Sequence, residues 1–167
     1  MSFKLSLDDL LAYSDWERAQ WHVWFQNNPV ALAVGLGPNT DGRFANIGEL
    51  TRHIFSAERR YVERALKLSL SDPSAGSADD VEALFALGRE TRLRLRDFLV
   101  SFPEAEWEAE REMQVGAKTW MVTPRKMILQ AVTHEIRHWA QIATMLRIAG
   151  HKTGSRDLIA SPIFGPA

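Results

Sequence analysis

Two histidines stand four residues apart in the stretch THEIRHWAQIATML, with a glutamate directly after the first of them. These residues are His134, Glu135 and His138. On a helix, side chains three or four positions apart project from the same face, so both imidazoles can reach one point. The stretch also matches the H-E-x-x-H pattern of zinc proteases. Three interpretations follow: a protease helix, another kind of metal site, or a core helix that contains two histidines.

Neighbouring positions extend the same helical face. Spaced three or four apart along it are Gln130, His134, His138, Gln141 and Met145. The flank of this face is apolar, which predicts that it points inward; it holds Ala131, Val132, Ile142 and Ile148. An isolated histidine pair is more often a hydrogen-bonded core pair than a metal site. His53 lies at the edge of an earlier apolar stripe. With this third histidine a metal site becomes the favoured interpretation, because three imidazoles from two helices suit zinc, nickel or another late divalent metal.

Two further histidines are left out of the predicted site. His22, beside Trp21, is either a fourth ligand or a boundary residue, and His151 is expected to be solvated. A protease also needs a third ligand downstream, and Asp157 is the carboxylate that keeps this interpretation open. Metalloproteases usually hold a peptide along a strand, and the sequence predicts no sheet.

The role of Glu135 depends on which interpretation holds. In a protease or hydrolase it is the candidate proton acceptor. Without a peptide-binding sheet, the simpler prediction is a solvent-side residue paired with Arg137 or another neighbour. Glu135 is therefore the one catalytic candidate, and no other catalytic residue is assigned.

The first two helices are predicted from their start signals. Ser6 followed by Asp9 predicts a capped helix that runs to about Gln26. Asn46 followed by Glu49 predicts the next, to about residue 69. Its buried stripe is predicted to contain Ile47, Leu50, Ile54, Ala57, Tyr61, Ala65 and Leu68.

The last two helices have equally clear ends. Ser77 with Asp80 predicts the cap of a third helix that ends near residue 103. Thr123 and Pro124 predict the start of a fourth helix, which runs to residue 149 and stops at Gly150. Residues 104–122 are weakly patterned, and 118–122 are predicted to cover one end of the bundle as extended chain.

These segments predict an all-α protein, a four-helix bundle with long loops between helices 1 and 2 and between helices 3 and 4. A chain of 167 residues that is 46% hydrophobic can bury one core, so residues 1–167 are predicted to form a single domain.

Composition excludes several classes of function. The 20 basic and 21 acidic residues give a net charge of -1 without long blocks of one sign, so we expect no nucleic-acid partner. The absence of cysteine excludes disulfides, thiolate ligands and a cysteine nucleophile. No signal peptide or membrane-length apolar segment is apparent, which favours a cytoplasmic protein with no membrane partner.

The segments around the histidines resemble a known family, the DinB/YfiT-like metal-binding four-helix bundles. The resemblance rests on His53 in GELTRHIFSAERRYVERAL and on HEIRHWAQIATMLRIAG, which has that family's H-x-x-x-H-x-x-Q pattern ending at a glycine. It covers most of the chain in helix order and length, and its specific residues are His53, His134, His138 and Gln141. It implies a divalent metal, most simply zinc or nickel, held by the three histidines, with water or substrate in the open positions.

The resemblance also implies a range of activities. Characterised members of the family include thiol-dependent transferases and isomerases that use a low-molecular-weight bacterial thiol. A metal with open positions lowers the pKa of bound water to about 7 and deprotonates a bound thiol. Because the chain has no cysteine, the thiol must be a cosubstrate.

We therefore expect a metal-dependent enzyme that activates a small thiol for transfer to an electrophilic small molecule. The alternatives are a metal-dependent hydrolase and a non-catalytic metal-binding or stress-response bundle. The resemblance further implies a homodimer. Trp16 and Trp139 are predicted either to anchor the partner on the outer faces or to complete the core.

Overall fold

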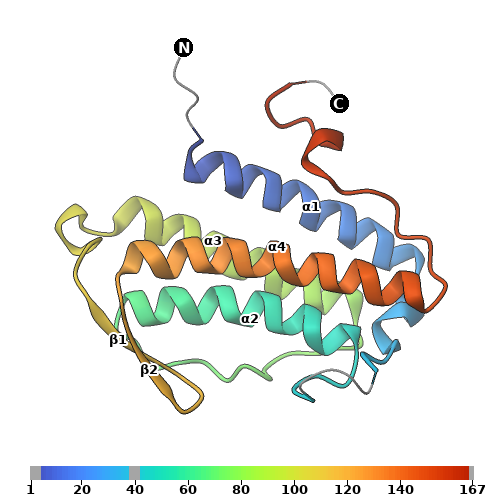
Figure 1. Cartoon of the computed structure of the whole chain (residues 1–167), viewed down its shortest axis with the longest axis horizontal. Helices are drawn as coiled ribbons and strands as arrows, with labels where there is room; N and C mark the ends of the chain where they lie inside the picture. The colour runs from blue at the N-terminus through green and yellow to red at the C-terminus, as the bar shows by residue number, and fades with distance from the viewer. Residues whose placement is uncertain (1–4, 38–41, 166–167) are drawn as a thin grey trace.

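Four long helices make up most of the molecule (Figure 1), which a computed structural model describes for residues 5–37 and 42–165. They are α1 (Leu7–Asn27), α2 (Ile47–Ala65), α3 (Val81–Ser101) and α4 (Pro124–Ile148). Three short 3-10 helices lie between or after them: η1 (Pro29–Ala33), η2 (Glu104–Glu106) and η3 (Leu158–Ala160). None of the helices in the described ranges has the length and apolar character that a membrane span needs. Of the first long loop, residues 38–41 lie outside the described part of the chain.

The helix starts agree with local capping chemistry. The Ser6 side chain accepts a hydrogen bond from the Asp9 N–H, and the Asp9 carboxylate accepts one from the Ser6 N–H, as predicted. Thr123 caps α4 with Pro124 in its first turn, which is also confirmed. The N-cap of α3 is Asp80, which accepts the N–H of Ala83, and the hydroxyl of Ser77 accepts the N–H of Asp80 (3.2 Å).

The second helix is shorter than predicted, while the fourth ends as expected. Lys67 takes a left-handed conformation (φ 58°), so α2 stops at Ala65 and Leu68 is exposed, outside the buried stripe. Gly150 has φ 88°, the conformation that ends a helix and that glycine adopts without strain.

A two-stranded sheet corrects the all-α prediction. β1 (Arg111–Val115) and β2 (Lys118–Val122) pair antiparallel, with Arg111 opposite Val122 and Val115 opposite Lys118. Gly116, at φ 58°, allows the tight turn between them. Most of the hairpin is exposed, so it lacks the alternation of a half-buried strand. It lies at one end of the bundle (Figure 1) and packs through Val122 against the core.

The core consists of two hydrophobic clusters along the bundle. One is rich in aromatic rings, and Trp139 lies at its centre, 5.5 Å from the ring of Trp21 and 6.0 Å from that of Phe55. Trp139 is fully buried, so of its two predicted places it takes the one in the core and not the one on an outer face. Trp16 is half-buried beside Tyr13. The predicted homodimer therefore loses one of its two proposed anchors.

A buried network of charges joins all four helices, one residue from each. Arg18 (α1), Glu58 (α2), Arg92 (α3) and Glu135 (α4) are each less than 10% exposed. Arg18 Nη2 is 2.8 Å from both Glu58 Oε2 and Glu135 Oε2, and Arg92 Nη2 lies 2.9 Å from Glu135 Oε2 and 3.0 Å from Glu58 Oε2. Each carboxylate thus meets two guanidinium groups, which is the pairing that buried charges require.

The C-terminal segment covers α1 and part of α4. Tyr13 donates a hydrogen bond to the carbonyl of Arg156 (2.8 Å), and the indole of Trp24 donates to that of Lys152 (3.0 Å). The guanidinium of Arg156 lies 3.7 Å from the ring centre of Trp21. Beneath this segment is Glu17, a carboxylate with only 6% exposure.

Glu17 is expected to make stability fall as pH rises. Burial and repulsion from Glu135 raise the pKa of its carboxyl to about 7 from 4.5, and the nearby Trp21 and Arg156 offset this only in part. Between these values Glu17 holds more protons in the folded protein than in the unfolded chain, so its contribution to stability is fully present below pH 4.5 and is lost as the pH rises through 7. Glu17→Gln should therefore raise the free energy of unfolding at pH 8 by on the order of 2 kcal/mol and change it little at pH 4.5.

Urea unfolding of the two proteins at both pH values measures this difference. Glu90→Gln is the matched control, because Glu90 is exposed on α3. If the unfolding free energies of Glu17→Gln and the parent changed with pH in the same way, the raised pKa of Glu17 would be contradicted.

Candidate metal centre

Three histidine rings meet on one side of the bundle, where α2 and α4 lie side by side (Figure 1). His134 Nε2 is 3.3 Å from His53 Nε2 and 3.0 Å from His138 Nε2. All three residues are half-buried, so the face is a boundary between core and solvent and does not point fully inward. Ala131, Val132 and Ile142 beside it are buried as predicted, whereas Ile148 is 77% exposed. The structure therefore brings together the three predicted metal ligands with a side open to solvent.

Gln141 orients the ring of His138. Its Oε1 lies 2.6 Å from His138 Nδ1, and because an amide oxygen only accepts, Nδ1 is the nitrogen that carries the proton and donates. The Nε2 of His138 then presents its lone pair to the other two rings. A partner that fixes the tautomer in this way is typical of metal-binding histidines.

His134 is held in its neutral form. Burial, followed by the positive potential of His138 and His53 and then of Arg137 and Arg43, lowers the pKa of His134 to about 3. At neutral pH no proton has to leave this ring before it binds a metal.

Residues from the loop before α2 and from α2 itself surround the histidines. The ring of Phe44 is 4.6 Å from that of His53, and the guanidinium of Arg43 lies over the Phe44 ring at 5.4 Å from its centre. The ring of Tyr61 is 6.4 Å from that of His134. No local signal marks Phe44 or Arg43, because they follow a loop whose path cannot be predicted from residue patterns.

Glu135 is not the solvent-side residue that the sequence predicted. It is 1% exposed, and its carboxylate accepts hydrogen bonds from Ser14 (2.7 Å), Arg92 (2.9 Å) and the indole of Trp139 (3.0 Å), in addition to Arg18. Burial opposes its ionisation, but the two guanidiniums outweigh that effect and hold the pKa of Glu135 below its usual range. These contacts come from α1, α3 and α4, and none of them involves the histidines.

The remaining candidates lie elsewhere. His22 is 3.0 Å from Glu82 and stacks on Phe85, and His151 is half-buried beside Trp24, so His151 is less solvated than expected. Asp157 bonds to Ser155 in the C-terminal segment. In the described part of the chain, the group that can hold a metal contains only the three histidines.

A comparison with family models shows to which family the chain belongs. The DinB family model matches residues 1–162. The chain belongs to the DinB family. A search of curated proteins found no match. The helix order and the three clustered histidines of this DinB protein thus agree with the resemblance of its sequence.

The donor set of the DinB protein fits a divalent ion. Zinc–nitrogen bonds of about 2.0–2.1 Å place two ligand nitrogens of a tetrahedral site about 3.3 Å apart. The Nε2 pairs at 3.0 and 3.3 Å match this spacing, and the three nitrogens all lie within 4.8 Å of one another. Three lone pairs aimed at one another repel unless a cation or a proton lies between them. His53, His134 and His138 are therefore close enough to hold a metal ion.

Replacing the partner of His138 should weaken metal binding in this DinB protein. Gln141→Ala removes the acceptor that fixes the ring, and loss of such a partner typically reduces metal affinity by about 10–100-fold. Competition with a chromogenic chelator measures the affinity. Gln130→Ala, a substitution on the same face, is the control, and an affinity for Gln141→Ala equal to that of the parent would refute the orienting role.

Proposed function

We propose that this DinB protein is a metal-dependent enzyme that activates a small thiol and transfers it to an electrophilic small molecule. The observation that carries the proposal is the convergence of three histidine Nε2 atoms on a half-buried face, without a carboxylate among the described residues of the cluster. Zinc or nickel is the expected ion, because imidazole nitrogen suits both.

A divalent ion held by three neutral nitrogens supplies a Lewis acid that keeps open positions and lowers the pKa of a bound thiol or water. The chain itself supplies the orientation. Gln141 fixes His138, and burial keeps His134 unprotonated, so both rings are ready to bind at neutral pH.

The absence of a nearby acid favours a thiol over water. A hydrolase usually pairs its metal with a carboxylate that accepts the proton of water. Here Glu135 is engaged by two arginines in the core, on the side away from the histidines. A thiol has a pKa of about 8.5 before any metal acts on it, so it needs no such base.

The surroundings of the histidines favour a substrate of negative charge. Arg43 and Arg137 are near enough to lower the pKa of His134. Their positive potential attracts an anion and stabilises a thiolate as it forms. Phe44 and Tyr61 provide apolar surface beside the rings for the remainder of the substrate.

In the transfer, the thiol proton goes to solvent, the sulfur forms a bond to the electrophilic carbon, and the leaving group departs with its electron pair. The chain has no cysteine, so the sulfur must come from the cosubstrate.

The test is a rate measurement with metal-loaded protein, a series of low-molecular-weight thiols and a fluorogenic alkyl halide. We expect at least one thiol to react at least tenfold faster than with metal-free protein, and His134→Ala to abolish the gain. Rates equal to the metal-free control across the whole series would reject the transferase. Hydrolysis of activated esters under the same conditions would instead identify a hydrolase.

A further inference from the structure

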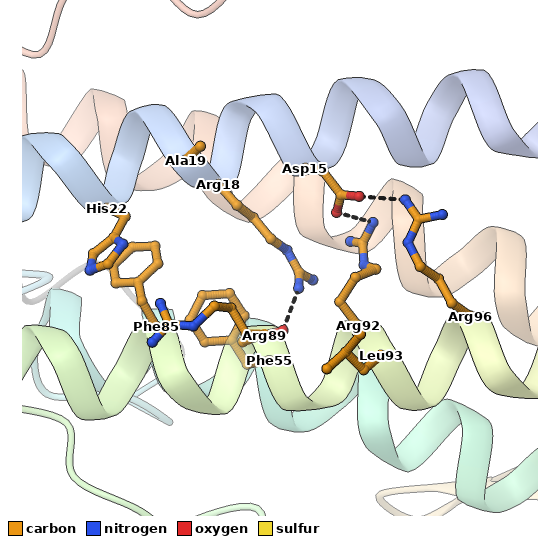
Figure 2. Close-up of a pocket in the computed structure, with 11 residues that line it drawn as sticks. Asp15, Arg18, Ala19, His22, Phe55, Phe85, Arg89, Arg92, Leu93 and Arg96 are labelled. Atoms are coloured by element: carbon orange, nitrogen blue, oxygen red, sulfur yellow. Dashed lines mark hydrogen bonds and ion pairs between the residues drawn. The ribbon is translucent and has the colours of Figure 1, made fainter.

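Two of the cavities that adjoin α1 differ in how their charged groups are paired. In the cavity between α1 and α3, Asp15 is shared between Arg92 and Arg96 (Figure 2). The other cavity, of about 400 Å³, lies between α1, α4 and the C-terminal segment, residues 151–165. None of the three clustered histidines lines it. Its wall contains Glu17, which forms no ion pair with the described residues.

Glu17 is a buried acid without the partners that a buried charge requires. Its Oε2 is shielded from solvent and makes no hydrogen bond of normal geometry with the described residues. Glu135 and Asp157 repel the ionised form. The indole of Trp21 and the guanidinium of Arg156 offset only part of this repulsion and of the cost of burial. Ionised Glu17 would therefore be stabilised by contact with water.

Two further ionisable groups on the cavity walls do not change this balance. Burial, followed by repulsion from Glu17 and Asp157, raises the pKa of Tyr13 to about 12, so its hydroxyl stays neutral. Arg147 is exposed on α4, where it bonds to Thr144, and it forms no ion pair with Glu17. Hydration thus remains the main way to stabilise a charge on Glu17.

The segment that closes this cavity is held by few contacts. None of residues 151–165 belongs to either hydrophobic cluster of the core. Three of its apolar residues are exposed, namely Leu158, Ile159 and Phe164. Figure 1 shows the segment lying along α1, where Tyr13 and Trp24 donate hydrogen bonds to its carbonyls. The guanidinium of Arg156 lies over the ring of Trp21. A segment with so few buried apolar contacts opens at a low cost in free energy.

We propose that the C-terminal segment is a pH-sensitive strap, which closes over the cavity while the Glu17 carboxyl is protonated and opens when this carboxyl ionises. Opening brings water to Glu17 and takes Asp157 away from it. The cost is the loss of the few contacts that hold the segment on α1 and α4. The strap is separate from the histidine face and has no part in the proposed thiol transfer.

The direction and the size of the effect follow from proton linkage. In the closed form, burial and repulsion from Glu135 raise the pKa of Glu17 to about 7, whereas a hydrated carboxyl has a pKa of 4.5. The advantage of the closed form is therefore fully present below pH 4.5 and is lost as the pH rises through 7. If opening hydrates Glu17 completely, the ratio of open to closed protein rises by up to about 300-fold.

Because the chain has no cysteine, a single introduced thiol can report the opening. Thr153→Cys places the thiol at a position of the segment that is only 4% exposed. Ser155→Cys is an exposed reference in the same segment, and Ala65→Cys is fully buried in α2. The rate of labelling with 4,4′-dithiodipyridine is measured at pH 5.5 and 8.5 on full-length protein freed of metal by chelation. Dividing each rate by that of Ser155→Cys at the same pH removes the pH dependence of thiol reactivity.

We expect the relative labelling rate of Thr153→Cys to rise at least about tenfold from pH 5.5 to pH 8.5. At pH 8.5 it should also exceed that of Ala65→Cys at least about tenfold, because the strap opens while the rest of the fold stays closed. A relative rate that does not rise with pH would overturn the proposal. So would a rate no higher than that of Ala65→Cys, because the segment would then open only when the whole protein unfolds.

Substitutions added to Thr153→Cys test the role of Glu17. Glu17→Gln should remove the rise with pH, because an amide does not ionise, whereas Glu90→Gln, exposed on α3, should retain it. Tyr13→Phe removes one hydrogen bond to the strap and should increase labelling at pH 5.5 by about threefold to tenfold. An undiminished rise in the Glu17→Gln protein would contradict the proposal.

Discussion

Glu135→Ala is expected to lower the free energy of unfolding by about 3–5 kcal/mol, because it leaves two buried guanidiniums with a single buried acid. Arg18 would then keep only Glu58, and Arg92 would keep Glu58 and the partly exposed Asp15. The indole of Trp139 would lose its acceptor in the same step. Since a domain of this kind is stable by about 5–15 kcal/mol, the loss is a large fraction of the total.

Urea unfolding of metal-free protein measures this effect apart from metal binding. The matched control is Glu90→Ala, which removes an exposed glutamate paired with Arg94 and should change stability by less than about 1 kcal/mol. Should Glu135→Ala fail to fold, Glu135→Gln, which keeps the shape and some hydrogen bonds, is expected to fold with reduced stability. An unfolding free energy of either variant within 1 kcal/mol of the parent would disprove the structural role of Glu135.

His134→Ala is expected to have the largest effect on metal binding. His134 Nε2 lies between the other two ring nitrogens, within 3.3 Å of each. Removing it leaves two ligands on different helices, so the affinity should fall by at least about two orders of magnitude, more than the loss of an outer partner such as Gln141. The unfolding free energy of the metal-free protein should change little, since the ring is half-buried and at the edge of the core.

The control for this experiment is His22→Ala. His22 also sits on a helix and contacts an acid, but it lies with Glu82 and Phe85 and not with the cluster. Its removal should leave metal affinity unchanged. If His22→Ala weakened binding as much as His134→Ala, a fourth histidine ligand would have to be added to the centre.

The helices and the cluster of three histidines could be predicted because most of their signals are local. Ser6 with Asp9 and Thr123 with Pro124 determine where helices begin through contacts within four residues. The spacing of His134 and His138 places both on one face whatever the tertiary structure. Only His53 required an assumption about packing, namely that the edge of its apolar stripe faces α4.

Glu135 was mispredicted because its partners come from two other helices. Its position after His134 resembles that of a protease base, and nothing within a few residues shows that Arg18 and Arg92 reach it. A signal did exist in Glu58, which stands four residues after Ile54 and four before Val62, both buried. A charge on that buried face requires a buried partner of opposite charge.

The extended conformation of residues 118–122 was predicted and is confirmed by β2, but β1 and its pairing with β2 were missed for a different reason. Its strands have five residues each and are mostly exposed, so no apolar alternation marks them. The usable signal was Gly116 between Val115 and the β-favouring run from Thr119 to Val122.

The most direct test of the metal centre is a crystal structure of the zinc-loaded protein with anomalous data collected at the zinc edge. The expected result is one strong peak within about 2.0–2.1 Å of the Nε2 atoms of His53, His134 and His138. A peak elsewhere, or a His53 ring turned away from the ion, would contradict the three-histidine site and remove the basis of the proposed chemistry.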